Sequence, residues 1–262
     1  MGARSTGSHP TTTKADGHLL EYFRQTFGAG GGANSGTTDP AVGLTASGGT
    51  ISNYTDGGVS YRAHTFTSSG TFSVSGLGNL GDGIEYLIVA GGASGGQNLA
   101  GGGGAGGLRT NLSGHPIAAA PYTVSAQSYT VVIGGGGASV STNNGTGNNG
   151  SNSNFYPTPV GYPNSSFVRS VGGGGGSGGG SGEGQDGGSG GGSPGYGYVQ
   201  PGNSPAYTGG AGNVPQDPNH PQVQGYTGGQ NGPNYGNNYI GGGGGGAGSI
   251  GCLLYTSDAA DE

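Results

Sequence analysis

The side chains that could do chemistry in this chain are few and far apart. None of the five histidines has a second histidine two, three or four residues away, and such spacings are typical of paired metal ligands. They are His9, His18, His64, His115 and His220. His115 lies in SGHPIAAAP, a segment that predicts a turn and not a catalytic base. We therefore expect no metal site.

Motifs for cofactors and nucleophiles are also missing. GxGxxG recurs because glycine is abundant, but no copy opens a predicted helix with an acidic residue about 20 positions later. There is no GxxxxGK[ST], and no GxSxG lies between a strand and a helix. Glu183 and Asp186 interrupt a glycine run without a DxDxDG loop, so we interpret them as solvent-facing and not as calcium ligands. We expect no enzyme activity and no cofactor.

Three segments rich in Tyr, Asn, Ser, Gly and Pro are the candidates for recognition: residues 141–159, 193–229 and 230–239. Binding loops favour this mixture, because tyrosine offers rigid amphipathic contact and the small polar residues adapt their hydrogen bonds. The tyrosines expected to contact a ligand or receptor are Tyr196, Tyr198, Tyr207, Tyr226, Tyr235 and Tyr239. A host-surface glycan or an outer-membrane protein would fit them. The alternative is that these segments are solubilising connectors.

Composition excludes several classes of partner. The chain has 262 residues, of which 71 are Gly and 14 are Pro, and its net charge is −6. Only Lys14 and five arginines are basic, which argues against a nucleic-acid binder. There is no apolar run long enough to span a membrane and no recognisable signal peptide. So strong a glycine bias is also typical of disordered low-complexity chains, and that alternative stays open.

The sequence divides into six parts. Residues 1–15 are polar and expected to be disordered, and 29–40 form a glycine-rich joint. Between them, residues 16–28 predict an amphipathic helix that docks other proteins or the downstream domain. Its apolar face comprises Leu19, Leu20, Phe23 and Phe27. Residues 41–135 predict strands, and 136–251 predict a glycine lattice with Tyr/Asn/Pro-rich loops.

The last part, residues 252–262, differs from everything before it. It reads CLLYTSDAADE, with no glycine and three acidic residues. It resembles the translation of a sequencing adapter, so we expect it to be an artefact that replaces the natural continuation. On this interpretation Cys252 supports no disulfide or thiol chemistry.

Within 41–135 the hydrophobic period is two. The clearest predicted hairpin pairs Ala63–Thr67 with Thr71–Ser75 around Ser68-Ser69-Gly70. IEYLIVAGG, from Ile84, predicts a strand buried on both faces, and YTVVIGGGG, from Tyr129, predicts another.

Glycine runs repeatedly follow such strands, as in IVAGG, VVIGGGG, SVGGGGG and YIGGGGGG. A flexible tether has no reason to begin at a buried strand. Extended glycine with three residues per turn can instead pack backbone against backbone. Ordering each glycine costs about 1–2 kcal/mol, close to what one hydrogen bond returns. We therefore expect apolar strands to clamp an all-β, polyglycine II-type lattice.

The segments YRAHTFTSSGTFSVSG, IEYLIVAGG, AGGLRTN, SAQSYTVVIGGGG and YIGGGGGGAG occur in this order. From about Ala15 to Gly251 the chain resembles the glycine-rich domain proteins of marine bacteriophages. Similar sandwiches of packed polyglycine helices occur in the adhesin tips of some phage tail fibres and in an extracellular domain of certain receptor tyrosine kinases. The Pro/Tyr/Asn-rich inserts have no clear equivalent in that pattern.

The resemblance implies a virion structural protein that is tail-fibre or adhesin-like and attaches to a host surface. Its other partners would be virion or tail proteins bound through the N-terminal helix, and its location would be the extracellular particle. Two alternatives remain: a non-specific glycine-rich coat or ice- or surface-interacting protein, and a disordered polymer.

Overall fold

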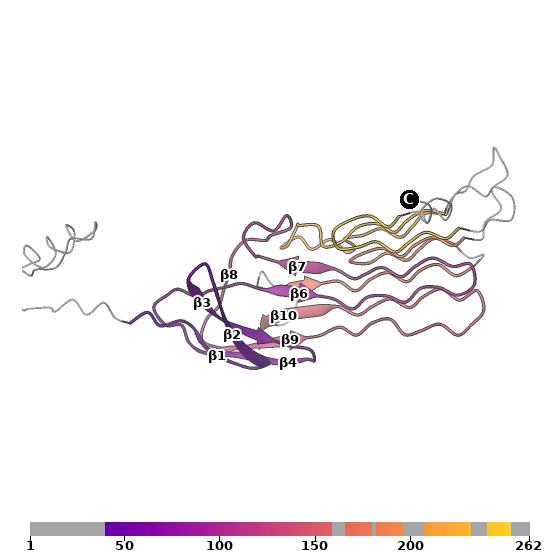
Figure 1. The fold of residues 1–262 in the computed structure, drawn as a ribbon. Coiled ribbons are helices and arrows are strands. Elements are labelled where there is room, and N and C mark those ends of the chain that lie inside the picture. Colours follow the sequence, from indigo (N-terminus) through magenta and orange to yellow (C-terminus); the bar gives the residue numbers. More distant parts are fainter. Residues whose placement is uncertain (1–39, 159–165, 180–181, 196–206, 232–239, 253–262) are drawn as a thin grey trace, which may run out of the picture. The chain divides into compact units, whose positions relative to one another are not determined.

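The structure is a computed structural model, and it describes residues 40–158, 166–179, 182–195, 207–231 and 240–252 (Figure 1). Strands and extended segments make up these ranges, and no helix occurs in them. The predicted helix at 16–28 lies outside the described residues. The chain divides into two units, Met1–Val42 and Gly43–Glu262, and every strand named below belongs to the second.

The main sheet has five antiparallel strands in the order β1-β4-β9-β10-β11. Its strands are β1 (Thr45–Ser47), β4 (Gly70–Gly76), β9 (Ser128–Val132), β10 (Ser153–Pro157) and β11 (Val168–Ser170). Three two-stranded antiparallel sheets accompany it. They pair β2 (Thr50–Asp56) with β3 (Val59–Thr65), β5 (Gly83–Ile84) with β8 (Tyr122–Thr123), and β6 (Leu87–Val89) with β7 (Leu108–Thr110). The fold of the described residues is therefore all-β, as expected.

Aromatic and β-branched residues of the main sheet form the hydrophobic core together with Tyr122 on β8 and the neighbouring Val124. The buried members are Phe72, Val74, Tyr122, Val124, Tyr129, Val131, Phe155 and Val168. Along β9 the burial alternates, because successive side chains of a strand point to opposite faces. The rings of Tyr129 and Phe155 stack with centroids 5.1 Å apart and planes 13° apart. This cluster fixes the register between β9 and β10.

The predicted hairpin between 63–67 and 71–75 is wrong in its pairing. Both segments form strands, but β3 pairs with β2, whereas β4 pairs with β1 and β9. Gly57 and Gly58, with φ of 55° and 82°, make the tight turn that joins β2 to β3. Positive φ at both central residues is what a two-residue hairpin turn requires. The turn chemistry at Gly57-Gly58 therefore decides the pairing.

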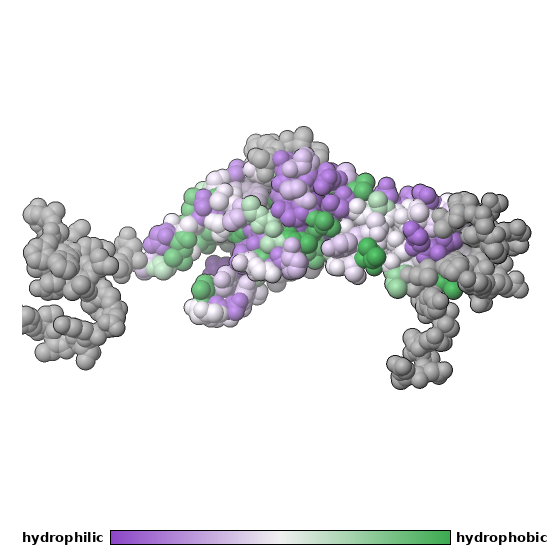
Figure 2. All heavy atoms as spheres, turned by 90° about the horizontal axis from the view of Figure 1, so that it is seen from above, coloured by the Kyte–Doolittle hydropathy of each residue, from purple (hydrophilic) through white to green (hydrophobic). Residues whose placement is uncertain are grey.

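The prediction that IEYLIVAGG is one strand buried on both faces is also wrong. The segment contains two short strands, β5 and β6, and the side chains of Leu87 and Val89 are 59% and 52% exposed. Ile88 packs against the core from the opposite face. On the face drawn in Figure 2, apolar residues reach the surface in several places among polar ones.

The glycine runs do continue from the strands. The chain passes from β6 into Gly91, from β9 through Ile133 into Gly134, and from β11 through Val171 into Gly172. Segments that follow β6 and β9 lie beside segments that lead into β7 and β10 (Figure 1). In the fourth predicted transition, residues 237–239 lie outside the described residues.

Candidate functional site

We use the name glycine array for the hydrogen-bonded segments that extend from the strands. These segments are 90–97, 101–107, 134–137, 145–152, 171–179, 184–195, 207–213, 224–231, 240–246 and 249–252. Their backbone amides bond to neighbouring segments and hardly at all within a segment. They differ from the strands of a sheet because the direction of bonding rotates along the chain.

The bonding repeats every three residues. In segment 90–97, Ala90, Ala93 and Gly96 donate their N–H groups to segment 101–107. The residue that follows each of these three donates its N–H group to segment 145–152 instead. These residues are Gly91, Ser94 and Gln97. A residue therefore shares its bonding partner with the residue three positions away, at N···O distances of 2.9–3.1 Å.

Segment 171–179 lies at the centre of this network. Gly173 and Gly176 donate to segment 90–97, whereas Gly174 donates to Ser189. The third direction is completed by side chains, since Asn152 Oδ1 accepts from Gly172 N and Asn149 Oδ1 accepts from Gly175 N. The backbone of this segment is thus bonded on three sides.

Close backbone contact explains why glycine occupies these positions. A β-carbon on Gly174 would lie 1.9 Å from Gln185 O, and one on Gly175 would lie 2.0 Å from Gly147 O. Real β-carbons essentially never approach another heavy atom within 3.0 Å. The neighbouring atoms are carbonyl oxygens of other array segments, and Gln185 O cannot move without breaking the bond that it accepts from Gly191 N.

The structure places parts of the expected recognition segments inside the array. Gly147 donates to Gly176 O, and Gly228 donates to Gly210 O. Residues 153–157 form β10. The prediction that 141–159 and 193–229 are loops is therefore only partly right. A polar side chain also bonds one of these recognition segments to the array. The exposed Asp186, in array segment 184–195, accepts a hydrogen bond from Ala211 N over 2.6 Å.

The end of the array opposite the strands brings several connections together. Gly179 donates to Gln97 O, and Gly195 donates to Leu99 O. Asn98 Nδ2 donates to Asn144 Oδ1 over 2.7 Å. We call this the array tip, defined by residues 97–100, 144–145, 179, 195 and 240–241. Residues 240–241 belong to the array tip because Gly241 lies against Ala100: a β-carbon on Gly241 would be 2.4 Å from Ala100 O.

Two of the six candidate tyrosines lie within the described residues. Tyr207 and Tyr226 are half-buried at the surface of the array, and Tyr226 N donates to Gly246 O while Tyr226 O accepts from Gly190 N. The other four lie outside the described residues: Tyr196, Tyr198, Tyr235 and Tyr239. So do Leu19, Leu20, Phe23 and Phe27 of the expected docking helix. The described part of the chain thus contains no cluster of the candidate tyrosines.

A buried polar cluster, which we call the polar junction, lies where β7 and β11 meet segment 217–224. Arg109 on β7 is 2% exposed; its Nε donates to Arg169 O over 3.3 Å, and its Nη1 donates to Gln222 O. Gln224 is fully buried; its Oε1 accepts from Val171 N and its backbone O accepts from Leu108 N. These contacts tie three segments together.

Asp217 and His220 complete the junction. They are 3% and 8% exposed, and Asp217 Oδ2 lies 3.5 Å from His220 Nδ1. Burial lowers the pKa of His220, the Asp217 carboxylate partly offsets this, and the Arg109 cation lowers it further. Burial also lowers the pKa of Arg109, with Asp217 acting in the opposite sense. The junction therefore holds a neutral imidazole beside the Asp217 carboxylate at pH 7.

Sequence reasoning does not find this cluster. His220 lacks a histidine neighbour, but a carboxylate precedes it by three residues in Asp217-Pro218-Asn219-His220. Asn219 N donates to Asp217 Oδ1 over 3.0 Å, and His220 N donates to Asp217 O over 3.1 Å, so the four residues form a turn. The Asp-Pro-Asn pattern is a signal for that turn. Nothing local indicates its approach to Arg109, which lies more than a hundred positions earlier.

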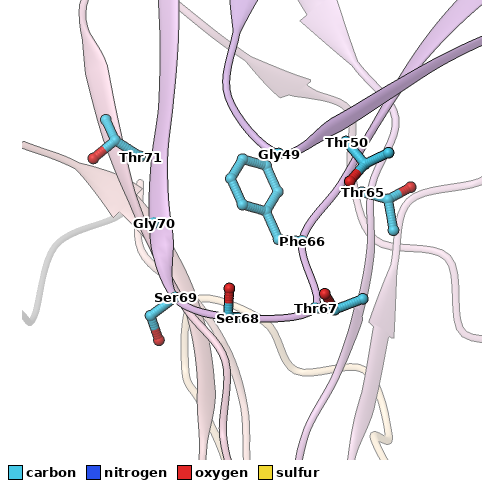
Figure 3. A pocket seen from close by; sticks show the side chains of 9 residues that line it. All are labelled: Gly49, Thr50, Thr65, Phe66, Thr67, Ser68, Ser69, Gly70 and Thr71. Carbon is cyan, nitrogen blue, oxygen red and sulfur yellow. The ribbon is translucent and has the colours of Figure 1, made fainter.

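A shallow hollow of about 270 Å³ lies between the β1–β2 and β3–β4 connections (Figure 3). It is lined by Gly49, Thr50, Thr65, Phe66, Thr67, Ser68, Ser69, Gly70 and Thr71. The Phe66 ring points toward Gly49, and a β-carbon there would lie 3.1 Å from the ring. The lining offers hydroxyl groups and one ring but no charged side chain.

Two further properties bear on chemistry. Among the described residues, no three His, Cys, Asp or Glu side chains lie together in a way that could hold a metal ion. Within the same ranges, no helix has the length and apolar character needed to cross a lipid bilayer.

Comparison with known proteins gives one match. The model of the family described as glycine-rich domain matches residues 67–259, which is more than half of the chain. No curated protein and no solved structure matches. The matched range contains β4 to β11 and the whole glycine array. The chain therefore belongs to the glycine-rich domain family.

Proposed function

We propose that the segments of the glycine array are polyglycine II-type helices packed side by side. Two observations support this proposal. The hydrogen-bond partner repeats every three residues, the period of an extended helix without internal bonds. The inter-segment spacing also excludes a β-carbon at most positions, as at the crowded axis of collagen.

We further propose that the array is a rigid scaffold whose tip presents loops for attachment to a surface. The observation that carries this proposal is the place where the tyrosine-bearing segments join the array. Segment 196–206 follows Gly195, whose amide bonds to Leu99 O. Segment 232–239 runs between Asn231 and Ile240, and Ile240 adjoins Gly241 at the same tip. Both segments therefore leave from one end of a scaffold held by backbone bonds.

The class of protein that fits this arrangement best is a virion structural protein of tail-fibre or adhesin type. The resemblance to glycine-rich phage proteins supports that class. Tyrosine and asparagine suit a glycan or the exposed face of an outer-membrane protein, since neither partner requires a strongly basic surface. Segment 16–28 would attach the chain to another virion protein.

Adsorption measurements test the attachment function. The full chain is immobilised on beads and offered a panel of neutral and acidic glycans and bacterial outer-membrane vesicles. A variant with Tyr196, Tyr198, Tyr235 and Tyr239 replaced by Ala is expected to lose at least tenfold in binding. Tyr54→Ala, at a tyrosine that is 50% exposed on β2, is the matched control and should bind like the wild type.

Undiminished binding by the fourfold variant would reject the role of the tip loops. Equal binding of the immobilised wild type to every glycan, to the vesicles and to plain hydrophobic particles would instead favour a non-specific surface protein.

A further inference from the structure

The segment that connects two parts of the array depends on the polar junction for its attachment. Upstream, Asn213 N and Val214 N bond to Gly188 O and Gly187 O. From 215 to 221, the backbone hydrogen bonds between described residues stay within the Asp217–His220 turn. The next attachment to another segment is the bond from Arg109 Nη1 to Gln222 O. Residues 215–222 are therefore attached to other segments through a side-chain hydrogen bond and not through backbone-to-backbone bonds.

The polar junction contains one positive and one negative side chain when His220 is neutral. Arg109 and Asp217 carry opposite charges, and neutral His220 lies 3.5 Å from Asp217 and also interacts electrostatically with Arg109. The charged and titratable groups that face the imidazole are Asp217 on its own turn and Arg109 on β7. Around Arg109 lie Tyr86, before β6, and Arg169 on β11. None of these groups supplies a second negative charge at neutral pH.

A proton on His220 therefore places two positive charges against one carboxylate in a buried site. Burying an unbalanced charge is strongly unfavourable. Water can relieve it only if the turn moves away from β7, because the imidazole and Arg109 come from different segments. Movement of the turn would break the bond to Gln222 O first, since no other backbone bond between described segments holds 215–221.

We propose that Asp217, His220 and Arg109 form an acid-sensitive clasp, which opens segment 215–222 away from β7 and β11 when His220 is protonated. The proposal concerns a conformational change in the fold and does not depend on the attachment function. Its consequence is that the turn at 215–222 becomes accessible below the pH at which histidine normally titrates, while Gln224 stays bonded to Leu108 N and Val171 N.

The direction of the pH dependence follows from the protonation states. The folded imidazole has a pKa below its usual value of 6.5, so the open form binds the proton more readily. Stability of the closed clasp is therefore complete above pH 6.5 and falls as the pH drops through that value toward the folded pKa. Within this window the opening equilibrium rises by up to about tenfold per pH unit.

Hydrogen exchange of the full chain at pH 7.5 and pH 5.0, corrected for the intrinsic pH dependence of amide exchange, tests the clasp. Peptides covering 214–222 should open more than twofold more often at pH 5.0. Peptides covering β9 and β10 should change less than twofold. A change of less than twofold in 214–222 would overturn the proposal.

Two variants assign the effect to one residue. His220→Gln, which cannot gain a charge, should show the same opening at both pH values. His115→Gln, at an exposed histidine in a turn, should retain the wild-type pH dependence. If His220→Gln retained it as well, the proposal would be wrong. Should that variant fail to fold, NMR titration of the wild-type imidazole decides the question: a His220 pKa at or above 6.5 contradicts the clasp.

Discussion

A β-carbon placed on Gly176 would lie 2.0 Å from the carbonyl oxygen of Gly101. The two residues are far apart in the sequence, and Gly101 N itself donates to Ser177 O over 2.8 Å. The contact is therefore part of a bonded backbone pair and not a chance approach. It means that the array has no space for the smallest side chain at its centre.

Gly176→Ala should consequently destabilise the protein by about 3 kcal/mol or more, because overpacking against fixed backbone forces whole segments apart. Gly135→Ala is the matched control, since a β-carbon on Gly135 would meet nothing within 4 Å and the φ of Gly135 is not in the left-handed region. Urea unfolding of both variants measures the difference. Equal stabilities would show that segment 171–179 is not held as tightly as the hydrogen bonds require.

Arg109→Met should also be strongly destabilising. It removes the hydrogen bonds to the carbonyl oxygens of Arg169 and Gln222, and it removes the positive charge that interacts with the buried Asp217 carboxylate. Leaving a buried acceptor without its hydrogen bond costs about 1–3 kcal/mol for each group. Thermal unfolding should show a clear drop in Tm.

Arg62→Met provides the comparison for that experiment. Arg62 is exposed on β3 and donates only to Asn53 Oδ1, at 3.2 Å, among the described bonds. Its replacement should change stability by no more than about 0.5 kcal/mol. A Tm for Arg109→Met equal to that of Arg62→Met would mean that the polar junction contributes nothing to the fold.

The side chain of Asn149 supplies the hydrogen-bond acceptor that a backbone carbonyl supplies to most other amides of the array. Its Oδ1 accepts a 2.7 Å hydrogen bond from Gly175 N, and Gly175 is buried. Asn149→Ala leaves that amide unsatisfied, which should cost about 1–3 kcal/mol. Asn149→Asp keeps an acceptor oxygen and should recover most of the loss. Asn143→Ala, at an exposed position, should be neutral in chemical denaturation, and a neutral Asn149→Ala would contradict the assigned role.

Tyr122 predicts a loss of stability in alkali. Its side chain is buried in the core and its hydroxyl donates to Ser166 O over 2.7 Å. Burial raises the pKa of Tyr122 well above its usual value of 10, and the nearby Tyr129 and Tyr86 raise it further. The folded state thus retains the proton that the unfolded chain releases, so stability falls as the pH rises above 10.

Absorbance at 295 nm during alkaline titration checks this, because the tyrosinate signal of Tyr122 should appear together with unfolding. Tyr122→Phe should have a smaller stability decrease above pH 10, whereas Tyr54→Phe, at an exposed ring, should behave as the wild type. A Tyr122 signal that appears near pH 10 in the folded protein would disprove the burial argument.

Sequence patterns locate the strands better than their partners. Period-two alternation correctly places Phe72 and Val74 on the buried face of a strand. It does not indicate that β4 pairs with β9 and not with β3, because alternation defines a face and carries no information about the neighbouring edge. The exposure of Leu87 and Val89 escapes prediction for a related reason: an apolar run does not reveal whether anything covers its second face.

The array can be predicted where glycine follows a strand, but not where polar residues intervene. Gly172 follows β11 by two residues, which makes its segment conspicuous. Gly147 and Gly228 lie among Asn, Thr and Tyr, and such polar side chains can complete the hydrogen bonds of the array, as that of Asn149 does. Glycine has no side chain to indicate which neighbour it will meet, and the polar junction joins residues more than a hundred positions apart. Neither relationship leaves a local pattern.

The most decisive measurement is hydrogen exchange of segments 172–177 and 187–193. We expect these amides to exchange about as slowly as those of β9, because nearly all of them are hydrogen-bonded to backbone or asparagine oxygens of the array. Exchange at the rate of a free glycine peptide would contradict it, and the scaffold on which the tip loops depend would not exist.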